Sequence, residues 1–451
     1  MDFKDKNVLV LGAGISGRSV AEVLVSHGAK VTLNDSKKLD DSIKEFQKLK
    51  YLGVEIISGW QNESLLQSVD YIVVSPGITI ELPIITAARS MGITIMSEIE
   101  VAFSICQAPI IAITGTNGKT TTTALTGEIL KAAGKNTVIG GNIGVALSQE
   151  VQGTTSSGVV VAEISSFQLE GIIHFRPHIA VILNLTPDHL DRHHTLEGYQ
   201  TAKERIFENQ NRHDYLVLNY DDLKVREMAN RTDAQIVVFS MQKEPENGGY
   251  IKDDQIVIKW QGKSHVICDV KDVRLLGKHN IENALAACCA AFLAGISPSI
   301  MADVLKKFSG VEHRIEPVTM INGVSYYNDS KATNPESSVK ALESFSGNII
   351  LIAGGRDKNT DLTEFMTLAR DKVDHMILIG EAQARFFEAA SQQGVCHIHT
   401  VMSLEEAVAT AHRLARSPQV VLLSPACASY DMFSNYEERG RVFKQLVHRL
   451  T

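Results

Sequence analysis

The segment Ile110-Ile111-Ala112-Ile113-Thr114-Gly115-Thr116-Asn117-Gly118-Lys119-Thr120-Thr121 joins an apolar, β-branched run to a glycine-rich turn. The run predicts a buried strand over residues 109–114, and a helix is expected to begin near Lys119. Consecutive amides in such a turn face a polyphosphate, the lysine reaches its terminal oxygens, and the hydroxyl of Thr120 can bind Mg²⁺. The general pattern, G-x-x-x-x-G-K-S/T, has glycine where this chain has Ile113. The context still favours a nucleotide site over an ordinary glycine turn.

The length and composition of the chain limit what it can be. Its 451 residues, 44% of them hydrophobic and 21% charged, suggest about three domains, each with its own core. The formal net charge of −8 argues against a general binder of nucleic-acid backbones, which usually carries a basic face. We therefore expect no nucleic-acid partner, and we expect any nucleotide to be held by a local site.

Cysteine usage and apolar runs indicate the compartment. The six cysteines include no C-x-x-C pair, so neither a disulfide scaffold nor a tetrathiolate zinc site is supported. The polar start, residues 1–7, lacks the features of a secretory signal, and the longest apolar run, residues 284–294, is too short to span a bilayer. We expect a soluble, reduced, cytoplasmic protein without membrane insertion.

A β-branched run, a turn and an apolar-periodic helix recur along the chain, a pattern typical of parallel α/β sheets. The pattern divides into three blocks, residues 1–97, 98–310 and 311–451. Within the second block a meander is expected, in which the runs 250–251 and 255–260 flank an Asp253-Asp254 turn. Further strands are predicted at residues 7–11, 30–34, 54–58, 70–74, 159–164, 179–185, 215–219, 264–270, 324–328, 348–353, 375–379 and 420–423.

The turn Gly12-Ala13-Gly14-Ile15-Ser16-Gly17 follows the first predicted strand and opens a helix. In that context it matches a Rossmann fingerprint, whose glycines permit a tight turn and bring an anion close to a helix amino terminus. Asp35 ends the second strand, where a carboxylate that binds a ribose would lie. Taken literally, the pattern predicts an NAD enzyme. The alternative is a helix-packing turn whose acid caps the next helix.

Acidic and histidine residues follow the strands of the second block. Glu163 ends a β-rich run, which makes it a candidate Mg²⁺ ligand, although a lone acid there is more often a surface group or a helix cap. The next strand ends in Leu185-Thr186-Pro187-Asp188-His189-Leu190-Asp191-Arg192-His193-His194. Zinc sites need a different spacing and Mg²⁺ prefers oxygen ligands. We therefore expect most of these side chains to be solvated and at most one to be functional.

Three further polar residues lie on predicted helices. Lys203 belongs to an amphipathic stretch, residues 199–209, where its residue type alone predicts a solvated charge. Asn280 is expected to cap the helix that it begins. Asn283 would lie inside that helix, where asparagine is disfavoured, so it is a candidate for a ligand contact.

Polar clusters in the third block each follow an apolar strand, and open α/β sheets bind ligands outside those carboxyl ends. Their basic groups would suit a carboxylate substrate or developing phosphoryl charge. The clusters are Arg314, Asn328-Asp329-Ser330-Lys331-Ala332-Thr333-Asn334, Gly354-Gly355-Arg356-Asp357-Lys358, Ser424-Pro425-Ala426-Cys427-Ala428-Ser429 and Asn435-Tyr436-Glu437-Glu438-Arg439-Gly440.

Taken together, these motifs resemble the ATP-dependent Mur ligases of peptidoglycan synthesis. The resemblance covers essentially the whole chain in the right order, and it includes the shortened phosphate loop. It rests on residues 115–121, 163–168, 188–191, 277–283 and 313–314. A likeness to the family member that adds D-glutamate rests on residues 328–334, 424–429 and 435–440.

The resemblance implies an α/β protein of three domains. Residues 1–97 would form a Rossmann-like domain that binds a UDP-sugar, with no nicotinamide. Residues 98–310 would form a central P-loop ATPase domain with a mostly parallel sheet plus a small antiparallel sheet. Residues 311–451 would form a Rossmann-like domain that receives the amino acid.

It also implies a reaction. The L-alanyl carboxylate of UDP-N-acetylmuramoyl-L-alanine would attack the γ-phosphate of ATP, and the amine of D-glutamate would then attack the resulting acyl phosphate. ATP and two Mg²⁺ ions are implied as cofactors. The family's place in cell-wall biogenesis connects such an enzyme to cell shape and division, and we expect a monomer.

Roles carry over by position as expectations. The implied catalytic residues are Lys119, Glu163, His189, Lys203 and Arg314. The implied metal ligands are Thr120, Glu163, His189 and Lys203, the last as its carbamate. ATP would be bound by Gly115, Thr116, Asn117, Gly118, Lys119, Thr120, Thr121, Asn280, Asn283, Arg314, Asp329 and Lys331. The UDP-sugar would be bound by Gly14, Ile15, Ser16, Asp35, Ser36, Lys37, Ser75, Pro76, Gly77, Asn142, Ser165 and His189. D-Glutamate would be bound by Thr333, Lys358, Ser429 and Tyr436.

Three other hypotheses compete with the ligase. An NAD-dependent oxidoreductase built on residues 12–17 leaves the phosphate loop at residue 115 unexplained. A P-loop switch or scaffold would bind nucleotide without turnover that depends on an amino acid. A folylpolyglutamate synthase would lack an amino-terminal domain of about a hundred residues ahead of the phosphate loop.

Overall fold

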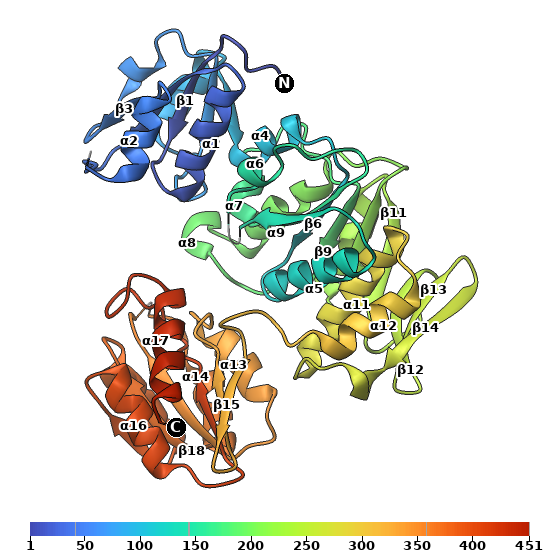
Figure 1. Cartoon of the computed structure of the whole chain (residues 1–451), viewed down its shortest axis with the longest axis vertical. Helices are drawn as coiled ribbons and strands as arrows, with labels where there is room; N and C mark the ends of the chain where they lie inside the picture. Colours follow the sequence, from blue (N-terminus) through green and yellow to red (C-terminus); the bar gives the residue numbers. More distant parts are fainter. Residues whose placement is uncertain (41, 143–144, 358, 451) are drawn as a thin grey trace. The chain divides into compact units, whose positions relative to one another are not determined.

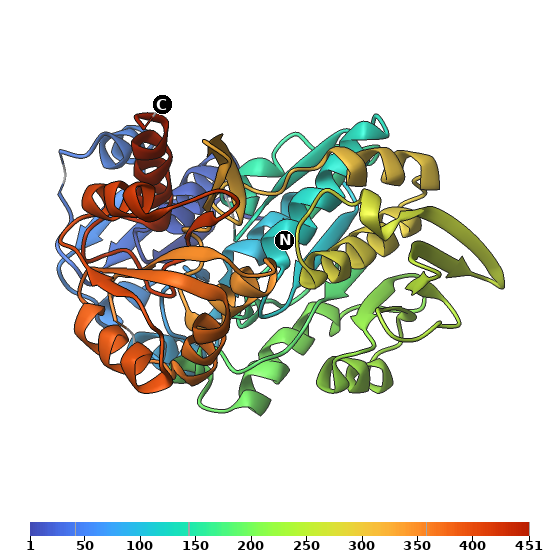
Figure 2. The ribbon, with the colours of Figure 1, turned by 90° about the horizontal axis from the view of Figure 1, so that it is seen from below.

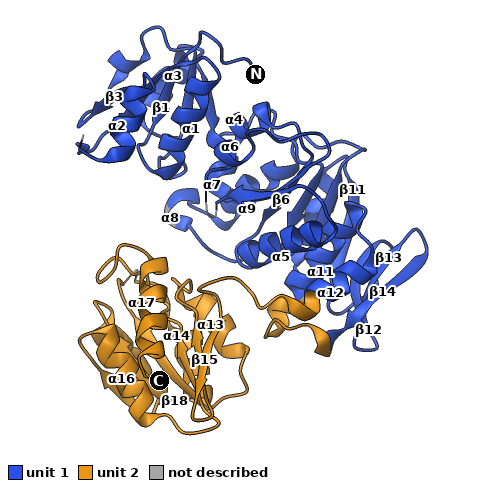
Figure 3. Ribbon diagram, viewed as in Figure 1, with its two compact units in different colours: residues 1–270, 282–304 blue, residues 271–281, 305–451 orange. Residues whose placement is uncertain are grey.

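Three sheets carry the fold, in a computed structural model that describes residues 1–40, 42–142, 145–357 and 359–450. The chain divides into two units (Figure 3): unit 1 holds residues 1–270 and 282–304, and unit 2 holds residues 271–281 and 305–451. Unit 1 contains the first two sheets and unit 2 contains the third (Figure 1).

The first sheet is parallel, with the strand order β3-β2-β1-β4-β5. Its central strands are almost continuous runs of valine, leucine and isoleucine, as expected where both faces of a sheet are covered. The order of strand addition reverses between β1 and β4, so the turns after these two strands meet at a switch point, where ligands bind in such sheets. The elements are β1 (Asn7–Leu11), α1 (Ile15–Ser26), β2 (Lys30–Asp35), α2 (Lys44–Tyr51), β3 (Glu55–Ser58), β4 (Tyr71–Val74), α3 (Pro83–Ser90) and β5 (Thr94–Ser97).

The second sheet has nine strands in the order β14-β13-β12-β11-β10-β9-β6-β8-β7. Strands β6 to β12 pair in parallel, and β13 and β14 continue the same sheet in antiparallel fashion; this ribbon projects at one end in Figure 2. Strand β6 lies between β8 and β9, so the loops after all three strands gather at one edge.

The second sheet is built from β6 (Ile110–Thr114), β7 (Thr137–Gly141), β8 (Val159–Glu163), β9 (Ile179–Ile182), β10 (Tyr215–Asn219), β11 (Gln235–Ser240), β12 (Gly248–Lys252), β13 (Gln255–Trp260) and β14 (Lys263–Asp269). The helices that accompany it are α4 (Glu98–Ile105), α5 (Lys119–Ala132), α6 (Leu147–Glu150), α7 (Ser166–Leu169), α8 (Leu190–His193), α9 (Leu196–Glu204), α10 (Leu223–Glu227), α11 (Lys278–Leu293) and α12 (Pro298–Lys307).

Helix α4, which follows the last strand of the first sheet, is anchored to a segment of the second sheet's part of the chain. Glu100 is fully buried, and its carboxylate accepts hydrogen bonds from the backbone N–H groups of Ile173, His174 and Phe175 at 2.8 to 2.9 Å. Three amide donors satisfy a buried charge that would otherwise be costly. This contact ties the two sheets of unit 1 together.

The third sheet lies in unit 2 and has the order β15-β16-β20-β17-β18-β19. Only the β15–β16 pair among its described strands is antiparallel. Because β16, β20 and β17 are neighbours, the loops after these strands share one edge. The elements are β15 (Glu316–Ile321), β16 (Val324–Asn328), α13 (Pro335–Glu343), β17 (Ile349–Gly354), α14 (Thr363–Lys372), β18 (Val373–Ile379), α15 (Gln383–Gln393), β19 (Ile398–Thr400), α16 (Leu404–Leu414), β20 (Val420–Leu423) and α17 (Tyr436–His448).

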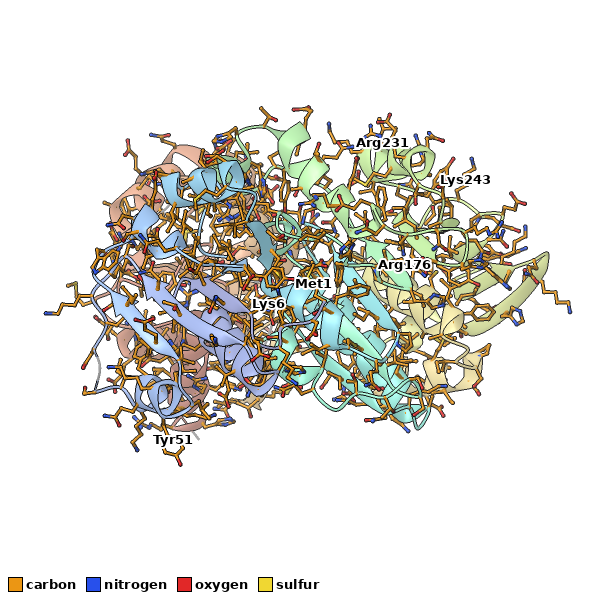
Figure 4. All side chains as sticks on the ribbon, turned by 90° about the horizontal axis from the view of Figure 1, so that it is seen from above. Met1, Lys6, Tyr51, Arg176, Arg231 and Lys243 are labelled. Atoms are coloured by element: carbon orange, nitrogen blue, oxygen red, sulfur yellow. The ribbon has the colours of Figure 1, made fainter. Side chains whose placement is uncertain are left out.

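The predicted α/β class is confirmed, and the Asp253-Asp254 turn joins β12 to β13 as expected, with both residues in the left-handed region at φ 48° and 58°. The sequence pattern missed the edge strands β7, β15 and β19 and the parallel strand β11. Charged and aromatic side chains such as Tyr51, which is 92% exposed, cover the surface (Figure 4). Among the described residues, no helix is both long enough and apolar enough to cross a membrane.

Candidate active site

The phosphate loop lies between β6 and α5, as predicted. Its backbone is shaped by glycine: Gly118 has φ 84°, and a Cβ there would lie 2.2 Å from the side-chain oxygen of Asn283. The Nζ of Lys119 donates to the carbonyls of Gly115 and Thr116 at 2.9 and 2.7 Å. The lysine therefore bends back over its own loop, at the point where α5 begins. This geometry can hold an anion.

Hydrogen bonds to the segment that follows the neighbouring strand β9 hold this loop in place. The backbone N–H of Asn117 donates to Asn184 Oδ1 at 2.8 Å, and Asn184 Nδ2 donates to the Asn117 carbonyl at 3.1 Å. Thr116 Oγ1 donates to the Thr186 carbonyl at 3.1 Å. Such bracing fixes the loop before any ligand binds, which reduces the ordering cost of binding.

Glu163 ends β8 beside the phosphate loop and is only 2% exposed. One carboxylate oxygen accepts a hydrogen bond from Asn142 Nδ2 at 2.9 Å, whereas Oε2 is buried and has no hydrogen-bond partner among the described residues. A buried carboxylate oxygen without a partner is costly unless a cation or donor completes it. The surface-acid alternative is therefore wrong, and Glu163 fits a cation ligand.

Lys203 is buried rather than solvated, which corrects the expectation from its residue type. It lies on α9, is 1% exposed, and its Nζ donates to the Gly115 carbonyl at 2.8 Å and lies 4.5 Å from the ring centre of Tyr199. The Nζ of Lys119 donates to the same Gly115 carbonyl. Burial first, and then the charge of Lys119, hold the pKa of Lys203 well below its ordinary value.

The segment after β9 differs from its prediction. His189 is exposed, as expected, and its ring packs against Phe167 at 4.8 Å between centres. Arg192 and His193, however, are 14% and 5% exposed at their side chains, so two of the side chains expected in water are largely covered by protein. Both pack against Phe167 and Glu170, contacts that spacing along the chain could not indicate.

A pocket of about 410 Å³ lies at the switch point of the first sheet. Its lining includes the predicted UDP-sugar residues Gly14, Ile15, Ser16, Asp35, Ser75, Pro76, Gly77 and Asn142. It also includes Ile78, Gly141 and Ala146, which the sequence did not single out, and Gln168, which was named only as part of the stretch 163–168. Ser36, Lys37, Ser165 and His189 are not part of this lining.

The fingerprint turn of this pocket is tightly packed. A Cβ on Gly17 would lie 1.8 Å from the Gly12 carbonyl oxygen, so only glycine permits the approach of α1. Asp35 accepts hydrogen bonds from the backbone N–H groups of Ala13 and Lys37, both at 2.9 Å. Asp35 therefore braces the turn from the neighbouring strand. In the second sheet's part of the chain, Ser165 and Gln168 form a capping box at the start of α7.

In unit 2, Asn280 and Arg314 line a second pocket, of about 240 Å³. Arg314 Nε is buried and has no hydrogen-bond partner among the described residues, and a donor of this kind fits a phosphate or another anion. Burial and the charge of Arg314 lower the pKa of the nearby His279 to about 4. Asn280 does not cap α11, because the helix already begins at Lys278; its side-chain amide donates to the Leu276 carbonyl at 2.6 Å.

Asn283, further along α11, belongs to unit 1 and is 4% exposed. Its Oδ1 accepts a hydrogen bond from Thr122 Oγ1 at 3.3 Å, next to Gly118. Within the protein, Asn283 therefore contacts the first turn of the phosphate-loop helix, and its predicted ligand contact stays a prediction.

Asp329 follows β16 and is 2% exposed. Its carboxyl accepts hydrogen bonds from Ser424 Oγ at 2.7 Å and from the backbone N–H of Ile315 at 3.2 Å. Burial raises the pKa of Asp329 to about 7, against the opposing effect of the Arg314 charge. The side chain therefore joins the loops after β16 and β20.

The loops at this edge of unit 2 carry the remaining predicted residues. Lys331 Nζ lies 5.6 Å from the ring centre of Tyr436, and the Tyr436 carbonyl accepts a hydrogen bond from Ser330 Oγ at 2.8 Å. Thr333 is half-buried two residues after Lys331, and Ser429 is buried in the loop after β20. Lys358 lies outside the described residues.

Arg439 was not singled out as a site residue by the sequence. It is 1% exposed and donates to the backbone carbonyls of Ser330, Cys427 and Ala428, at 2.8 to 3.2 Å. Burial lowers its pKa to about 10. Arg439 thus fixes the two loops that carry Lys331 and Ser429. Its place in the stretch 435–440 was the only sign in the sequence that it belongs to the site.

The predicted metal ligands do not form a closed group of acidic and histidine side chains. In the described part of the chain, the group of three such residues whose ligand atoms approach within 4.8 Å is Glu312, His313 and Glu316, in unit 2. Lys444 Nζ already pairs with both carboxylates there, at 2.6 and 2.9 Å. That cluster is an ion-pair network and lies apart in sequence from every predicted ligand.

Family models match three successive stretches of the chain. A "Mur ligase MurD-like, N-terminal domain" matches residues 6–97, a "Mur ligase middle domain" matches residues 113–291, and a "Mur ligase, glutamate ligase domain" matches residues 313–427. The unmatched residues between them are few, so the three models account for most of the sequence.

Curated relatives match along the full length. A protein of Thermoanaerobacter sp. (strain X514), named UDP-N-acetylmuramoylalanine--D-glutamate ligase, is 46% identical and is covered completely, as is this chain. A protein of the same name from Alkaliphilus metalliredigens (strain QYMF) is 44% identical over 100% of this chain and 99% of its own.

Solved structures agree on the fold. UDP-N-acetylmuramate-alanine ligase MurC of Thermotoga maritima superimposes with a TM-score of 0.62 at 20% identity, covering 99% of this chain and 100% of that one. MurF of Acinetobacter baumannii gives 0.61 at 16% identity, with 99% and 91% covered. With a phosphate loop, a buried carboxylate and a buried lysine converging at one sheet edge, and with relatives of this identity over its whole length, the chain belongs to the Mur ligase family.

Proposed function

We propose that the protein is an ATP-dependent ligase that joins D-glutamate to UDP-N-acetylmuramoyl-L-alanine, releasing ADP and phosphate, in peptidoglycan precursor synthesis. The observation that carries this function is the 46% identity, over the whole of both chains, to a relative named UDP-N-acetylmuramoylalanine--D-glutamate ligase. The phosphate loop, Glu163 and Lys203 would supply the groups that such a reaction needs.

The chemistry explains the need for ATP. A free carboxylate has a poor leaving group, so its oxygen first attacks the γ-phosphate of ATP and becomes an acyl phosphate. The amine of D-glutamate then attacks the acyl carbon, and the tetrahedral intermediate collapses with loss of phosphate. Lys119 would offset charge on the phosphoryl group as it transfers, because its Nζ already lies over the phosphate loop, on the carbonyls of Gly115 and Thr116.

The division of labour follows the three blocks. Residues 1–97 would bind the UDP-sugar, residues 98–310 would bind ATP, and residues 311–451 would bind D-glutamate. The pocket at Gly14, Asp35 and Ser75 supports the first assignment, because its turn and its helix amino terminus suit a pyrophosphate. Within this scheme Asn142, Ser165 and His189 would contact the muramoyl part of the substrate.

The residues present fit Mg²⁺. Glu163 Oε2 is buried and lacks a partner among the described residues, and hard oxygen donors are the ligands that Mg²⁺ prefers. Thr120, Glu163 and His189 would hold the metal, together with Lys203 as its carbamate. When bound, Mg²⁺ supplies charge neutralisation for the ATP phosphates.

Lys203 is suited to carbamate formation. Its pKa is held well below the ordinary value by burial, so a larger share of the amine is neutral and nucleophilic. The neutral nitrogen would attack CO₂, forming an N–C bond as a C–O π bond opens, and would release one proton. Counted from the ammonium form, two protons leave, and a carboxylate-like ligand replaces a buried cation.

Unit 2 would hold the remaining ligands. Asn280, Arg314 and Asp329 would position the nucleotide, with the unpartnered Nε of Arg314 directed to a phosphate, and Lys331 would assist. Thr333, Lys358, Ser429 and Tyr436 would bind the carboxylates of D-glutamate. We place the protein in the cytoplasm, where its nucleotide substrates occur, and propose that it acts as a monomer.

A phosphate-release assay tests the function. UDP-N-acetylmuramoyl-L-alanine and ATP are supplied with D-glutamate, L-glutamate, L-lysine or meso-diaminopimelate in separate reactions. Turnover with D-glutamate alone is the expected result. Preference for a diamino acid would contradict the proposed substrate, and nucleotide binding without turnover by any amino acid would indicate a switch or scaffold.

A further inference from the structure

Arg192 makes a contact that links two parts of unit 1. It lies on α8, three residues after His189, and its guanidinium donates from Nη1 to the Pro76 carbonyl at 3.0 Å and from Nη2 to the Ile78 carbonyl at 2.8 Å. These carbonyls belong to the turn that follows β4 in the first sheet, whereas Arg192 follows β9 in the second. A single side chain therefore joins the His189 segment to the turn 75–78.

The turn 75–78 lines the UDP-sugar pocket. Ser75 Oγ donates to the Gly12 carbonyl at 3.0 Å, and Ile78 lies where a Cβ on Gly12 would be 3.0 Å away. The turn thus packs against the fingerprint glycines on one side, and its carbonyls accept hydrogen bonds from Arg192 on the other. Movement of the turn would change the shape of the pocket.

The guanidinium is itself held in place. Glu170 pairs with Arg192 through Nε and Nη2, and the Phe167 ring lies 4.5 Å below the guanidinium carbon. The side chains of Arg192 and Glu170 are 14% and 10% exposed, so little water competes for these contacts. Only a planar fork can meet one carboxylate, two carbonyls and a ring face together, and lysine offers no such geometry.

The backbone around Arg192 is unusual. His189 and His194, on either side of α8, have φ values of 53° and 63°. Non-glycine residues occupy this region at a cost and persist there only where the surroundings fix them. The Arg192 contacts, together with His193 Nε2 to Ser166 Oγ at 2.9 Å, fix this segment.

We propose that Arg192 is a positioning residue for the UDP-sugar: it holds the turn 75–78 against α8, so that the pocket wall and His189 keep one relative placement. This inference rests on the proposed function, since the ligand of the pocket is taken to be the UDP-linked substrate. Arg192 itself needs no contact with the reacting atoms.

The test compares Arg192→Lys with a matched control, Arg205→Lys. Arg205 also donates to backbone carbonyls, those of Leu169, Glu170 and Ile172, but all of these lie in the central part of the chain and none in the turn 75–78. For each full-length variant, Kd values of UDP-N-acetylmuramoyl-L-alanine and of ATP are measured separately by calorimetry, with KM, kcat and Tm.

Arg192→Lys is expected to raise Kd and KM for the UDP-sugar about tenfold or more, because two charge-assisted hydrogen bonds to the turn are lost, while Kd for ATP stays within about twofold. Arg205→Lys is expected to leave the UDP-sugar Kd within about twofold at a similar change in Tm. If Arg192→Lys fails to fold, Glu170→Gln is tested instead, because it removes the carboxylate charge that holds the same guanidinium. Kd for the UDP-sugar should then rise by a smaller factor.

The outcomes separate the two proposals. Equal effects of Arg192→Lys and Arg205→Lys on the two Kd values, with the unaltered protein binding the UDP-sugar, would overturn the role of Arg192 and leave the function intact. A parallel loss of ATP affinity would show a purely structural role and would also overturn it. Failure of the unaltered protein to bind the UDP-sugar would remove the proposed function and this inference with it.

Discussion

Replacing Asp329 by asparagine should remove a pH dependence of stability from unit 2. Burial raises the pKa of this carboxyl to about 7, from 3.8 for an unperturbed group. Between these values the folded chain keeps the proton that the unfolded chain has lost, so stability falls as pH rises through the window and is constant above it. The full difference corresponds to about 4 kcal/mol, and the part between about pH 5.5 and about pH 8 to about 2 kcal/mol.

Asparagine is a good mimic of the protonated acid at this position. Its oxygen can still accept from the backbone N–H of Ile315, and its amide can donate to Ser424 Oγ, which now accepts. The variant should therefore match the parent at low pH. Above about pH 7 it should be more stable than the parent by up to about 4 kcal/mol, since it carries no buried charge.

The assay must report on unit 2. Both tryptophans, Trp60 and Trp260, lie in unit 1, so fluorescence would follow the wrong part of the chain. Amide hydrogen exchange of β16 and β20, which flank Asp329, gives a local opening free energy instead. The quantity compared is the difference between parent and variant at each pH, because all other groups cancel. A difference that does not change between about pH 5.5 and about pH 8 would show that the carboxyl is ionised throughout and would refute the reasoning.

Two further predictions concern the phosphate loop. Lys203→Ala should lower kcat about 100-fold or more and recover part of it when a small carboxylate is added, whereas Lys119→Ala should not be rescued in this way; unchanged activity would show that Lys203 serves packing alone. Gly118→Ala should abolish ATP binding in calorimetry, because its Cβ would lie 2.2 Å from Asn283 Oδ1 at φ 84°. Gly134→Ala is the matched control, with φ 75° and open space around its Cβ, and should lower Tm without changing ATP affinity.

Much of the fold could be predicted because its signals are local. The apolar runs of β6, β8 and β10 are buried on both faces, so their composition identifies them without reference to their neighbours. The edge strands β15 and β19 carry mixed, half-exposed sequences, and their existence depends on a partner strand that the chain supplies elsewhere. Local patterns cannot supply that information.

The candidate site could be predicted where it requires a particular backbone conformation. It was harder to predict where packing with distant residues determines the environment of a side chain. Glycines that permit close approach, such as Gly17 and Gly118, leave a spacing that can be read directly. Lys203 and Arg192 leave no such spacing, because each has the residue type of a solvated charge. Groups from distant parts of the chain bury Lys203 and cover most of Arg192. For Lys203 only the family resemblance indicated a role, and for Arg192 nothing did.

Two buried charged groups at the carboxyl edges of the sheets are better suited to ligand binding than to stability. A buried carboxylate oxygen or guanidinium nitrogen without a partner costs about 1–3 kcal/mol, more when charged, and an apolar side chain of similar size would avoid the cost. Glu163 Oε2 and Arg314 Nε are both in that state among the described residues, and both follow or flank strands at the carboxyl edges where ligands bind. The buried carboxylate of Glu100, by contrast, accepts three amide hydrogen bonds and joins two sheets. The buried carboxylate oxygens Glu98 Oε2 and Asp431 Oδ1 also lack a partner among the described residues, so a missing partner alone does not identify a ligand site. Glu163 and Arg314 differ by their location, the first beside the phosphate loop and the second in the pocket of unit 2, where a metal ion and a phosphate would complete them.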